Sequence, residues 1–268
     1  MNSAARGLGV IILCAIIFGC INGGYAPSAP LYFLYVPNYT NSDFSVFSVN
    51  SASGNLTPIT NSPFSAGNHP SSAAVDPSGQ FLFISNNTSD TIQSFSINSV
   101  TGTPTLVGVI ANPNGPYVLT ADPNGNFVYS INNGSVNCIS GYTINFSSGA
   151  LTEMANSPFA CGGAGNHGTV DPTGKFIFVA GTGLGGVVGF TINPTTGSLT
   201  EVTGSPFTCG TTPHQLAIDP AGKFLFAANQ NSDNVTIFKI DTTTGRLTPA
   251  GQTLQLGNPS CVVFVSRR

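Results

Sequence analysis

A motif of eight residues recurs four times along the chain at a nearly constant interval. Each copy reads Asp-Pro-x-Gly followed by an aromatic-rich run, and the four copies start at Asp76, Asp122, Asp171 and Asp219. The intervals are 46 residues (76 to 122), 49 residues (122 to 171) and 48 residues (171 to 219). A fixed period of this length indicates an array of one repeated structural unit.

Each unit divides into four short strands. Asp-Pro-x-Gly is a reverse turn, because Pro fixes φ at its second position and Gly closes it. In the last unit it separates a first strand at 213–218 from an aromatic second strand at 224–229, and residues 235–240 show the period-two alternation of a third strand. A Gly-bearing turn then leads to a short fourth strand. Four antiparallel strands per unit predict an all-β fold, the β-propeller.

The first and last units are incomplete in complementary ways. The array starts with a second strand, residues 31–36, and ends with a first strand, residues 258–266. We therefore predict five four-stranded blades over 31–268, in which three N-terminal strands and one C-terminal strand share the closing blade and hide two sheet edges. The length excludes seven blades unless the ring assembles from more than one chain.

The N-terminus is typical of an exported protein. "GLGVIILCAIIFG" contains 13 residues, fewer than the ~20 that span a bilayer, so we predict a signal peptide over 1–19. Gly-Cys at its end resembles the lipobox of bacterial lipoproteins, which implies lipidation of Cys20; an ordinary cleaved signal is the alternative. Under the same resemblance, Ile21 favours the outer membrane, so we expect an extracytoplasmic, lipid-anchored protein of the outer membrane or periplasm. Residues 20–30 are then a tether.

The composition limits the partners of the protein. Only 6% of the residues are charged and the formal net charge is -3, so the chain has no basic footprint for nucleic acid. We expect a monomer without a cofactor, although a divalent cation at the channel mouth stays open.

The repeat unit resembles a known family. "DPxGxFLFxxN", preceded by Pro and Ala and followed by "SDxxxxFxI", "TGxLT" and "SPF", is similar to the repeats of lactonase-type β-propellers, which include bacterial 6-phosphogluconolactonases, and to YVTN-type surface repeats. The resemblance covers residues 31–266. It implies an active site at the mouth of the central channel, where loops lead into the first strands. The chain offers no cation there for a substrate phosphate, which argues against 6-phosphogluconolactonase activity itself.

All three histidines fall in these loops. His214, in "PHQ", matches a Pro-His element that the resembling repeats place at the mouth, and we take His214 and His69 as candidate catalytic residues and His167 as a ligand-binding residue. The three stand at different offsets from the following Asp-Pro turn, which argues against a metal triad. Strand pleating predicts that His167 points oppositely to the other two.

Two further groups of residues are candidates. Asp43, Asp90 and Asp233 form a second repeated set on the mouth side, where they either close Asx-type turns or contact a ligand. Cys138 and Cys161 flank the same face of one blade and are expected to form a disulfide, while Cys209 and Cys261 pair separately or stay free.

Two function classes follow. The first is a divergent lactone hydrolase that uses His214, with His69, as general base toward a lactone ester. The second is a surface-anchored, non-catalytic binding or scaffold propeller that contacts glycan or protein through Asn, Ser and Thr groups.

Overall fold

The fold consists of five antiparallel sheets. The computed structural model describes residues 15–16, 32–134 and 137–263. The first sheet contains β1 (Ala15–Ile16), β2 (Tyr32–Asn38), β3 (Asp43–Val49) and β4 (Leu56–Pro58), with β5 (Phe64–Ser65) paired to β3. The second contains β6 (Pro70–Val75), β7 (Phe81–Asn86), β8 (Thr91–Ile97) and β9 (Pro104–Ala111). The third contains β10 (Pro116–Ala121), β11 (Phe127–Asn132), β12 (Ile139–Ile144) and β13 (Leu151–Glu153).

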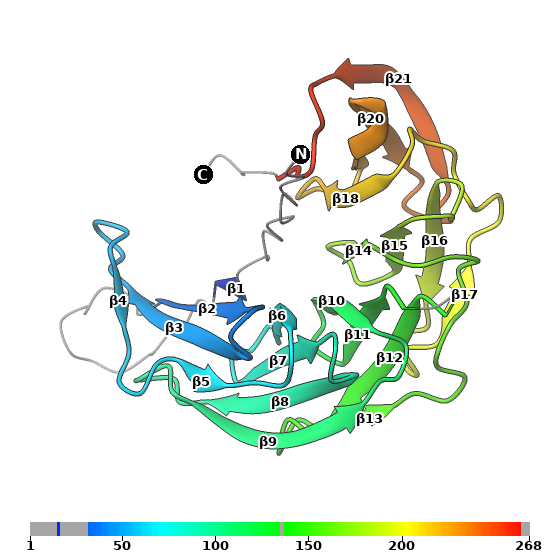
Figure 1. The fold of residues 1–268 in the computed structure, drawn as a ribbon. Helices are drawn as coiled ribbons and strands as arrows, with labels where there is room; N and C mark the ends of the chain where they lie inside the picture. The colour runs from blue at the N-terminus through cyan, green and yellow to red at the C-terminus, as the bar shows by residue number, and fades with distance from the viewer. Residues whose placement is uncertain (1–14, 17–31, 135–136, 264–268) are drawn as a thin grey trace, which may run out of the picture.

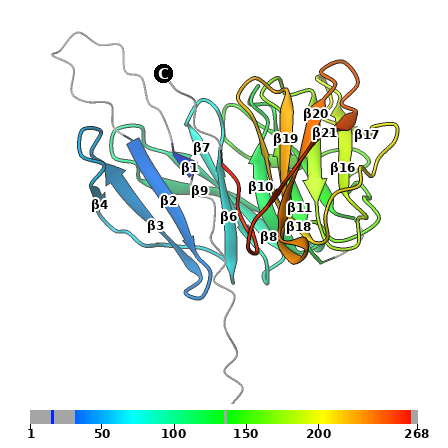
Figure 2. The same cartoon turned by 90° about the horizontal axis from the view of Figure 1, so that it is seen from above.

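The last two sheets follow the same order. The fourth contains β14 (His167–Val170), β15 (Phe176–Ala180), β16 (Val187–Ile192) and β17 (Leu199–Glu201). The fifth contains β18 (Pro213–Ile218), β19 (Phe224–Asn229), β20 (Asn234–Ile240) and β21 (Leu247–Gln255), with a 3-10 turn η1 (Gln230–Ser232) before β20. The first strands β6, β10, β14 and β18 lie on the inner side and the fourth strands on the outer side (Figure 1), and the sheets stand side by side in the view from above (Figure 2). The predicted all-β propeller is confirmed.

Four hydrophobic cores hold the sheets together, one between each pair of neighbours. The core between the first two sheets contains Phe33, Tyr35 and Phe44 packed against Leu82 and Ile84. Equivalent cores join the second sheet to the third, the third to the fourth and the fourth to the fifth. Burial of these side chains is the main stabilising contribution to the fold.

The aromatic second strand of one sheet packs against the Gly-bearing hairpin of the next. We call this contact the inter-sheet joint. One phenylalanine near the start of each of the first four second strands lies against the hairpin Gly of the next sheet: Phe33 with Gly102, Phe81 with Gly149, Phe127 with Gly197 and Phe176 with Gly245. A Cβ on any of these glycines would overlap the ring, and each has a positive φ between 72° and 79°. Glycine therefore suits these four positions for two physical reasons, the positive φ and the close approach of the ring.

The predicted closure of the ring is wrong. The strand next to β2 is β1, with Ala15 opposite Tyr35, and residues 258–263 form no strand. Instead, the carbonyl of Ser260 lies 3.3 Å from Nδ1 of His214 on β18. A closed ring of five blades needs five inter-sheet cores, whereas the described residues form four, and the arc in Figure 1 is open between the first and fifth sheets. Between earlier sheets the chain passes from an outer fourth strand to the next inner first strand. The residues after β21 follow the same course, and Ser260 therefore lies beside β18.

The Asp-Pro carboxylates hold their own turns. Oδ1 of Asp76 accepts a hydrogen bond from the backbone N–H of Phe81 at 2.7 Å, and Oδ1 of Asp171 accepts from Lys175 and Phe176 at 2.7 Å each. Asp219 makes the same pair of contacts. These carboxylates therefore stabilise the turn between the first and second strands.

Most of the predicted signal peptide and tether, including Cys20, lies outside the described residues. Within the described part of the chain, no helix is both long enough and apolar enough to cross a bilayer.

Candidate functional site

One ring-bearing side chain from each sheet lies at the face where the first strands begin, which we call the mouth face. They are Tyr39, His69, Tyr117, His167 and His214. Tyr39 follows β2, His69 precedes β6, Tyr117 is the second residue of β10, His167 begins β14 and His214 is the second residue of β18. Tyr117 and His214 both stand five residues before the Asp of their Asp-Pro turn, so they occupy the same position of the repeat.

One ring nitrogen of His214 contacts a backbone carbonyl, and no hydrogen bond to the other is found among the described residues. Its Nδ1 lies 3.3 Å from the backbone carbonyl of Ser260. A carbonyl oxygen can only accept, so this contact places the ring proton of neutral His214 on Nδ1. The lone pair is then on Nε2, which is the arrangement that a general base requires.

His167 has the opposite arrangement. Its Nδ1 accepts a hydrogen bond from the backbone N–H of Leu216 on β18 at 3.4 Å, so the proton of the neutral ring lies on Nε2. This Nε2 is buried and has no partner among the described residues. Burial and, to a smaller extent, the nearby His214 lower the pKa of His167 to about 4, so the ring is neutral at pH 7. An unpaired buried donor costs about 1–3 kcal/mol, which a ligand oxygen would offset.

The low pKa of His167 predicts an acid-sensitive fold. The unfolded chain has a histidine pKa of ~6.5, above the folded value of about 4, so the unfolded state binds the proton more readily. The free energy of unfolding should therefore fall as the pH drops from ~6.5 to ~4, by up to about 3 kcal/mol. Urea unfolding at pH 7 and pH 4.5 measures this loss. His167→Gln should lose less over the same interval, and an equal loss in both proteins would contradict the assignment.

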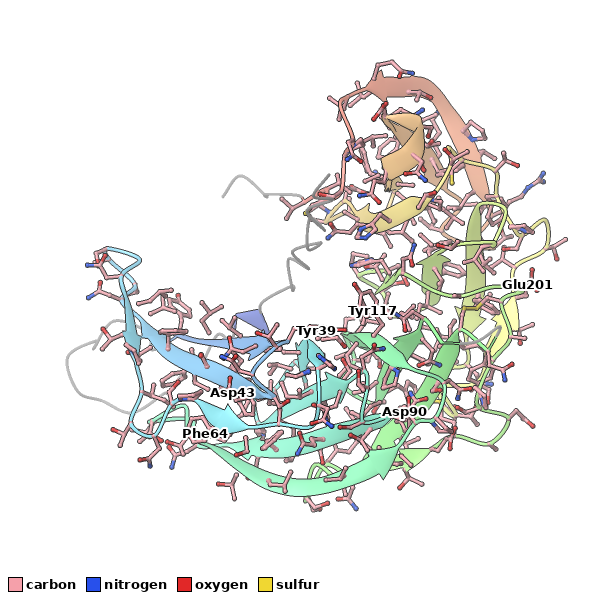
Figure 3. The ribbon with its side chains drawn as sticks, viewed as in Figure 1. Tyr39, Asp43, Phe64, Asp90, Tyr117 and Glu201 are labelled. Atoms are coloured by element: carbon pink, nitrogen blue, oxygen red, sulfur yellow. A yellow bond between two sulfur atoms is a disulfide. The ribbon has the colours of Figure 1, made fainter. Side chains whose placement is uncertain are left out.

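His69 belongs to a different group of contacts. Its ring is 4.5 Å from that of Tyr39 between centroids, at an interplanar angle of 36°, and its Nδ1 is 2.7 Å from Oγ1 of Thr88. Tyr117 lies close enough to Tyr39 that this neighbour, after burial, contributes to raising the pKa of Tyr117. Figure 3 shows Tyr39 and Tyr117 near one another on the inner side of the arc. His214 thus lies near enough to His167 to contribute to its lowered pKa, and His69 makes a ring contact with Tyr39.

The three predicted aspartates do not meet. Oδ1 of Asp43 accepts a hydrogen bond from Nδ2 of Asn38 at 2.6 Å, and Oδ1 of Asp233 accepts from the backbone N–H of Asn258 at 2.7 Å. Asp90 has a φ of 53°, and its carbonyl accepts from the N–H of Asn112 at 2.7 Å. They lie on three different sheets, and Figure 3 shows Asp43 and Asp90 apart. Asp43 and Asp233 therefore hold the mouth loops in place.

The mouth face is poor in positive charge. The four lysine and arginine residues in the described part of the chain are exposed and lie outside the mouth loops: Lys175, Lys223, Lys239 and Arg246. Glu201 projects from β17 at the outer rim (Figure 3). No group of three or more His, Cys, Asp or Glu side chains placed to hold a metal ion occurs in the described ranges.

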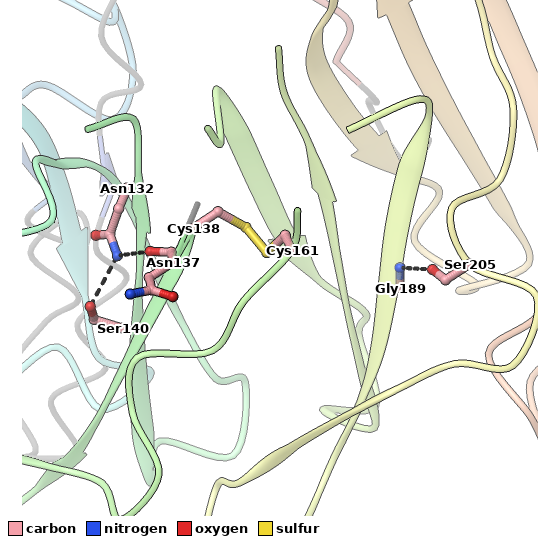
Figure 4. The surroundings of a disulfide bond; sticks show 7 residues. All are labelled: Asn132, Asn137, Cys138, Ser140, Cys161, Gly189 and Ser205. Carbon is pink, nitrogen blue, oxygen red and sulfur yellow. Dashed lines mark hydrogen bonds between the residues drawn. A yellow bond between two sulfur atoms is a disulfide. The ribbon is translucent and has the colours of Figure 1, made fainter. Parts of the chain in front are cut away.

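A disulfide fixes the segment that leads to His167. Cys138 and Cys161 are bonded, with their Cα atoms 5.6 Å apart, as the sequence suggested (Figure 4). The N–H of Gly165 donates to the carbonyl of Asn132 at 2.8 Å in the same region. Cys209 and Cys261 are not in a disulfide.

Strand pleating alone does not fix the direction of the His214 side chain. β18 has a register irregularity between Pro213 and Gln215 that changes the alternation there, so the predicted opposition of His167 and His214 stays a prediction. Tyr39 and Tyr117 were not singled out at all. The signal for Tyr117 is "GPYVLT", which has a Tyr after Pro where the last unit has "PHQLAI".

Comparison with known proteins identifies the family. The model of the family described as "Lactonase, 7-bladed beta-propeller" matches residues 29–119 and 169–264. No curated protein matches the chain. The family description counts seven blades, whereas the described residues form five sheets, so the predicted five-bladed ring also differs from the family in blade number.

Solved structures of similar fold include several lactonases. A provisionally assigned 6-phosphogluconolactonase from Bacteroides uniformis is 25% identical, with a TM-score of 0.74 over 90% of this chain and 72% of that one. The periplasmic gluconolactonase of Pseudomonas aeruginosa is 23% identical, with a TM-score of 0.70 over 88% of this chain and 70% of that one. A protein from Lactobacillus plantarum is 20% identical, with a TM-score of 0.76, over 90% and 76% of the two chains. The last two likenesses concern the fold alone.

The repeats, the sheet arrangement and the family match over most of the chain agree, and the protein belongs to the lactonase family of β-propellers.

Proposed function

We propose that the protein hydrolyses an uncharged sugar lactone at the mouth face, with His214 as general base. The observation that carries the proposal is the pairing of opposite ring tautomers: Nε2 of His214 has a free lone pair, and Nε2 of His167 has an unpaired, buried proton. Hydrolysis of an ester needs both a proton acceptor for water and a donor for the carbonyl oxygen. The family to which the chain belongs supports this reaction class.

The two rings divide the reaction between them. His214 Nε2 takes a proton from water while the water oxygen bonds to the lactone carbonyl carbon. The N–H of His167 donates to the carbonyl oxygen, on which negative charge develops. The bond between the carbonyl carbon and the ring oxygen then breaks, and the ring oxygen receives the proton from His214. The product is the open-chain hydroxy acid, and both histidines return to their starting states.

The uncharged substrate follows from the mouth face, which is poor in positive charge. A phosphate group is bound in proteins by Arg, Lys or a helix N-terminus. The four cations in the described part of the chain lie outside the mouth loops, and the described residues contain only one 3-10 turn of three residues. The site therefore offers hydrogen bonds to hydroxyl groups but no ion pair to a phosphate.

The test is a hydrolysis assay with glucono-δ-lactone and its 6-phosphate, each corrected for the rate in buffer. We expect kcat/KM to favour the uncharged lactone by about tenfold or more. The phosphate would leave water without gaining a charge-assisted hydrogen bond here, and one such bond corresponds to about that factor. Hydrolysis of neither lactone above the buffer rate would overturn the proposed activity. Preference for the phosphate ester would overturn the proposed substrate class.

We propose that the protein works outside the cytoplasm. The disulfide between Cys138 and Cys161 supports this location, because disulfides persist in oxidising compartments. The lipid anchor at Cys20, in the outer membrane or facing the periplasm, stays a prediction.

A further inference from the structure

Three aromatic rings from three successive sheets form a cluster that the proposed reaction does not use. The ring centroids of Tyr39 and His69 are 4.5 Å apart with the ring planes tilted by 36°, and Tyr117 lies near Tyr39 (Figure 3). All three side chains are half-buried, so part of each remains open to solvent. We call these three residues the aromatic shelf.

The backbone turn at His69 does not explain the choice of histidine. His69 has a φ of 52° and is followed by Pro70. The residue before the corresponding Pro has a positive φ in other units too, where it is Gly115, Thr212 or Asn258. Gly and Asn adopt this conformation most easily. The turn therefore does not require the imidazole at position 69. The orientation of this ring is set by its contacts with Thr88 and Tyr39.

The chemistry of the shelf fits a sugar ring. Flat aromatic faces bury the apolar face of a ring, while the phenol hydroxyls and the second nitrogen of His69 can bond hydroxyl groups at its edge. The surrounding loops are polar and contain carboxylates but no Lys or Arg, and Nδ2 of Asn87 donates a hydrogen bond to Oδ1 of Asn133 there at 3.0 Å. These loops suit a polyhydroxylated ligand better than an anionic one.

We propose that the aromatic shelf binds a sugar ring that does not itself react, so that the substrate is a lactone linked to a second sugar. The reacting end of this substrate rests on the proposed function, whereas sugar binding by the shelf does not. Tyr117 lies between the aromatic shelf and the proposed reaction site at His167, because its strand β10 is the neighbour of β14, which begins with His167.

The experiment uses cellobiose as a binding probe, and cellobiono-1,5-lactone and glucono-δ-lactone as substrates. Tyr39→Ala and His69→Asn remove a ring, and Asn retains the positive φ. We expect both variants to weaken cellobiose binding, measured by calorimetry or NMR, by about threefold to tenfold. Tyr39→Ala should raise KM for the disaccharide lactone by the same factor and leave kcat/KM for the single-ring lactone within about twofold.

The matched control is Phe146→Ala. Phe146 is an aromatic residue that is 62% exposed, in the hairpin between β12 and β13 on the opposite face, and its removal should change neither binding nor KM. Cellobiose binding that is absent from the wild type, or unchanged in Tyr39→Ala, overturns the shelf even if lactones are hydrolysed. Cellobiose binding through the shelf without any lactone hydrolysis overturns the proposed function alone.

Discussion

Replacing His214 with glutamine is expected to lower kcat for hydrolysis of glucono-δ-lactone by about 100- to 10,000-fold, the usual contribution of a general base. Glutamine is close in size and can still donate to the carbonyl of Ser260, which His214 contacts at 3.3 Å. It has no lone pair basic enough to take a proton from water. KM should change little, because the side chain acts on water rather than on the sugar. Steady-state kinetics of the purified variant measure both constants.

The control for this result is Glu201→Gln. Glu201 is exposed on β17 at the outer rim, so the loss of its carboxylate should leave kcat unchanged. Thermal unfolding of His214→Gln should match the wild type, which separates loss of the base from loss of the fold. A properly folded His214→Gln variant with more than half of the wild-type kcat would rule out His214 as the base.

Adding one methyl group to the hairpin of the third sheet is expected to destabilise the protein more than the same change in the first sheet. Gly149 and Gly54 occupy the same turn of the repeat, with φ of 79° and 72°. A Cβ at 149 would overlap the ring of Phe81, whereas nothing lies within 4 Å of one at 54. Both Ala variants lose about 1–2 kcal/mol to the left-handed conformation. Gly149→Ala should lose about 1–3 kcal/mol more through overpacking.

Chemical unfolding of the two variants measures this difference directly. The pair isolates the inter-sheet joint, since backbone strain is common to both. Equal losses of unfolding free energy would mean that Phe81 moves away from the new methyl without cost, and that the joint between Phe and Gly does not hold neighbouring sheets together.

The fold could be predicted in its repeated parts and not at its ends. The Asp-Pro turns are predictable because the hydrogen bonds that hold them are local. The carboxylates accept from backbone N–H groups a few residues further on, as at Asp76, Asp171 and Asp219. The position of residues 258–263 depends instead on the spacing of whole sheets around the axis. That spacing is set by packing in the cores between the sheets, which no local motif records.

The candidate site could be located from the sequence but not assembled from it. The loops that carry His69, His167 and His214 were identified correctly as one face of the fold. The direction of His214 depends on the irregularity in β18 between Pro213 and Gln215, and the position of the His69 ring depends on its tilted contact with Tyr39. Tyr117 shares its repeat position with His214, and this match is visible in the sequence only when the units are compared for any ring-bearing side chain and not for histidine alone.

The five rings of the mouth face project from loops and strand starts, while stability resides in the four cores between the sheets. Under the proposed function, a replacement at one ring should therefore change ligand preference at little cost in folding free energy. Ligand preference can diverge during evolution through single exchanges, one sheet at a time, on an unchanged frame. Relatives that share this frame need not share a substrate, and the five mouth positions are where their differences should be sought.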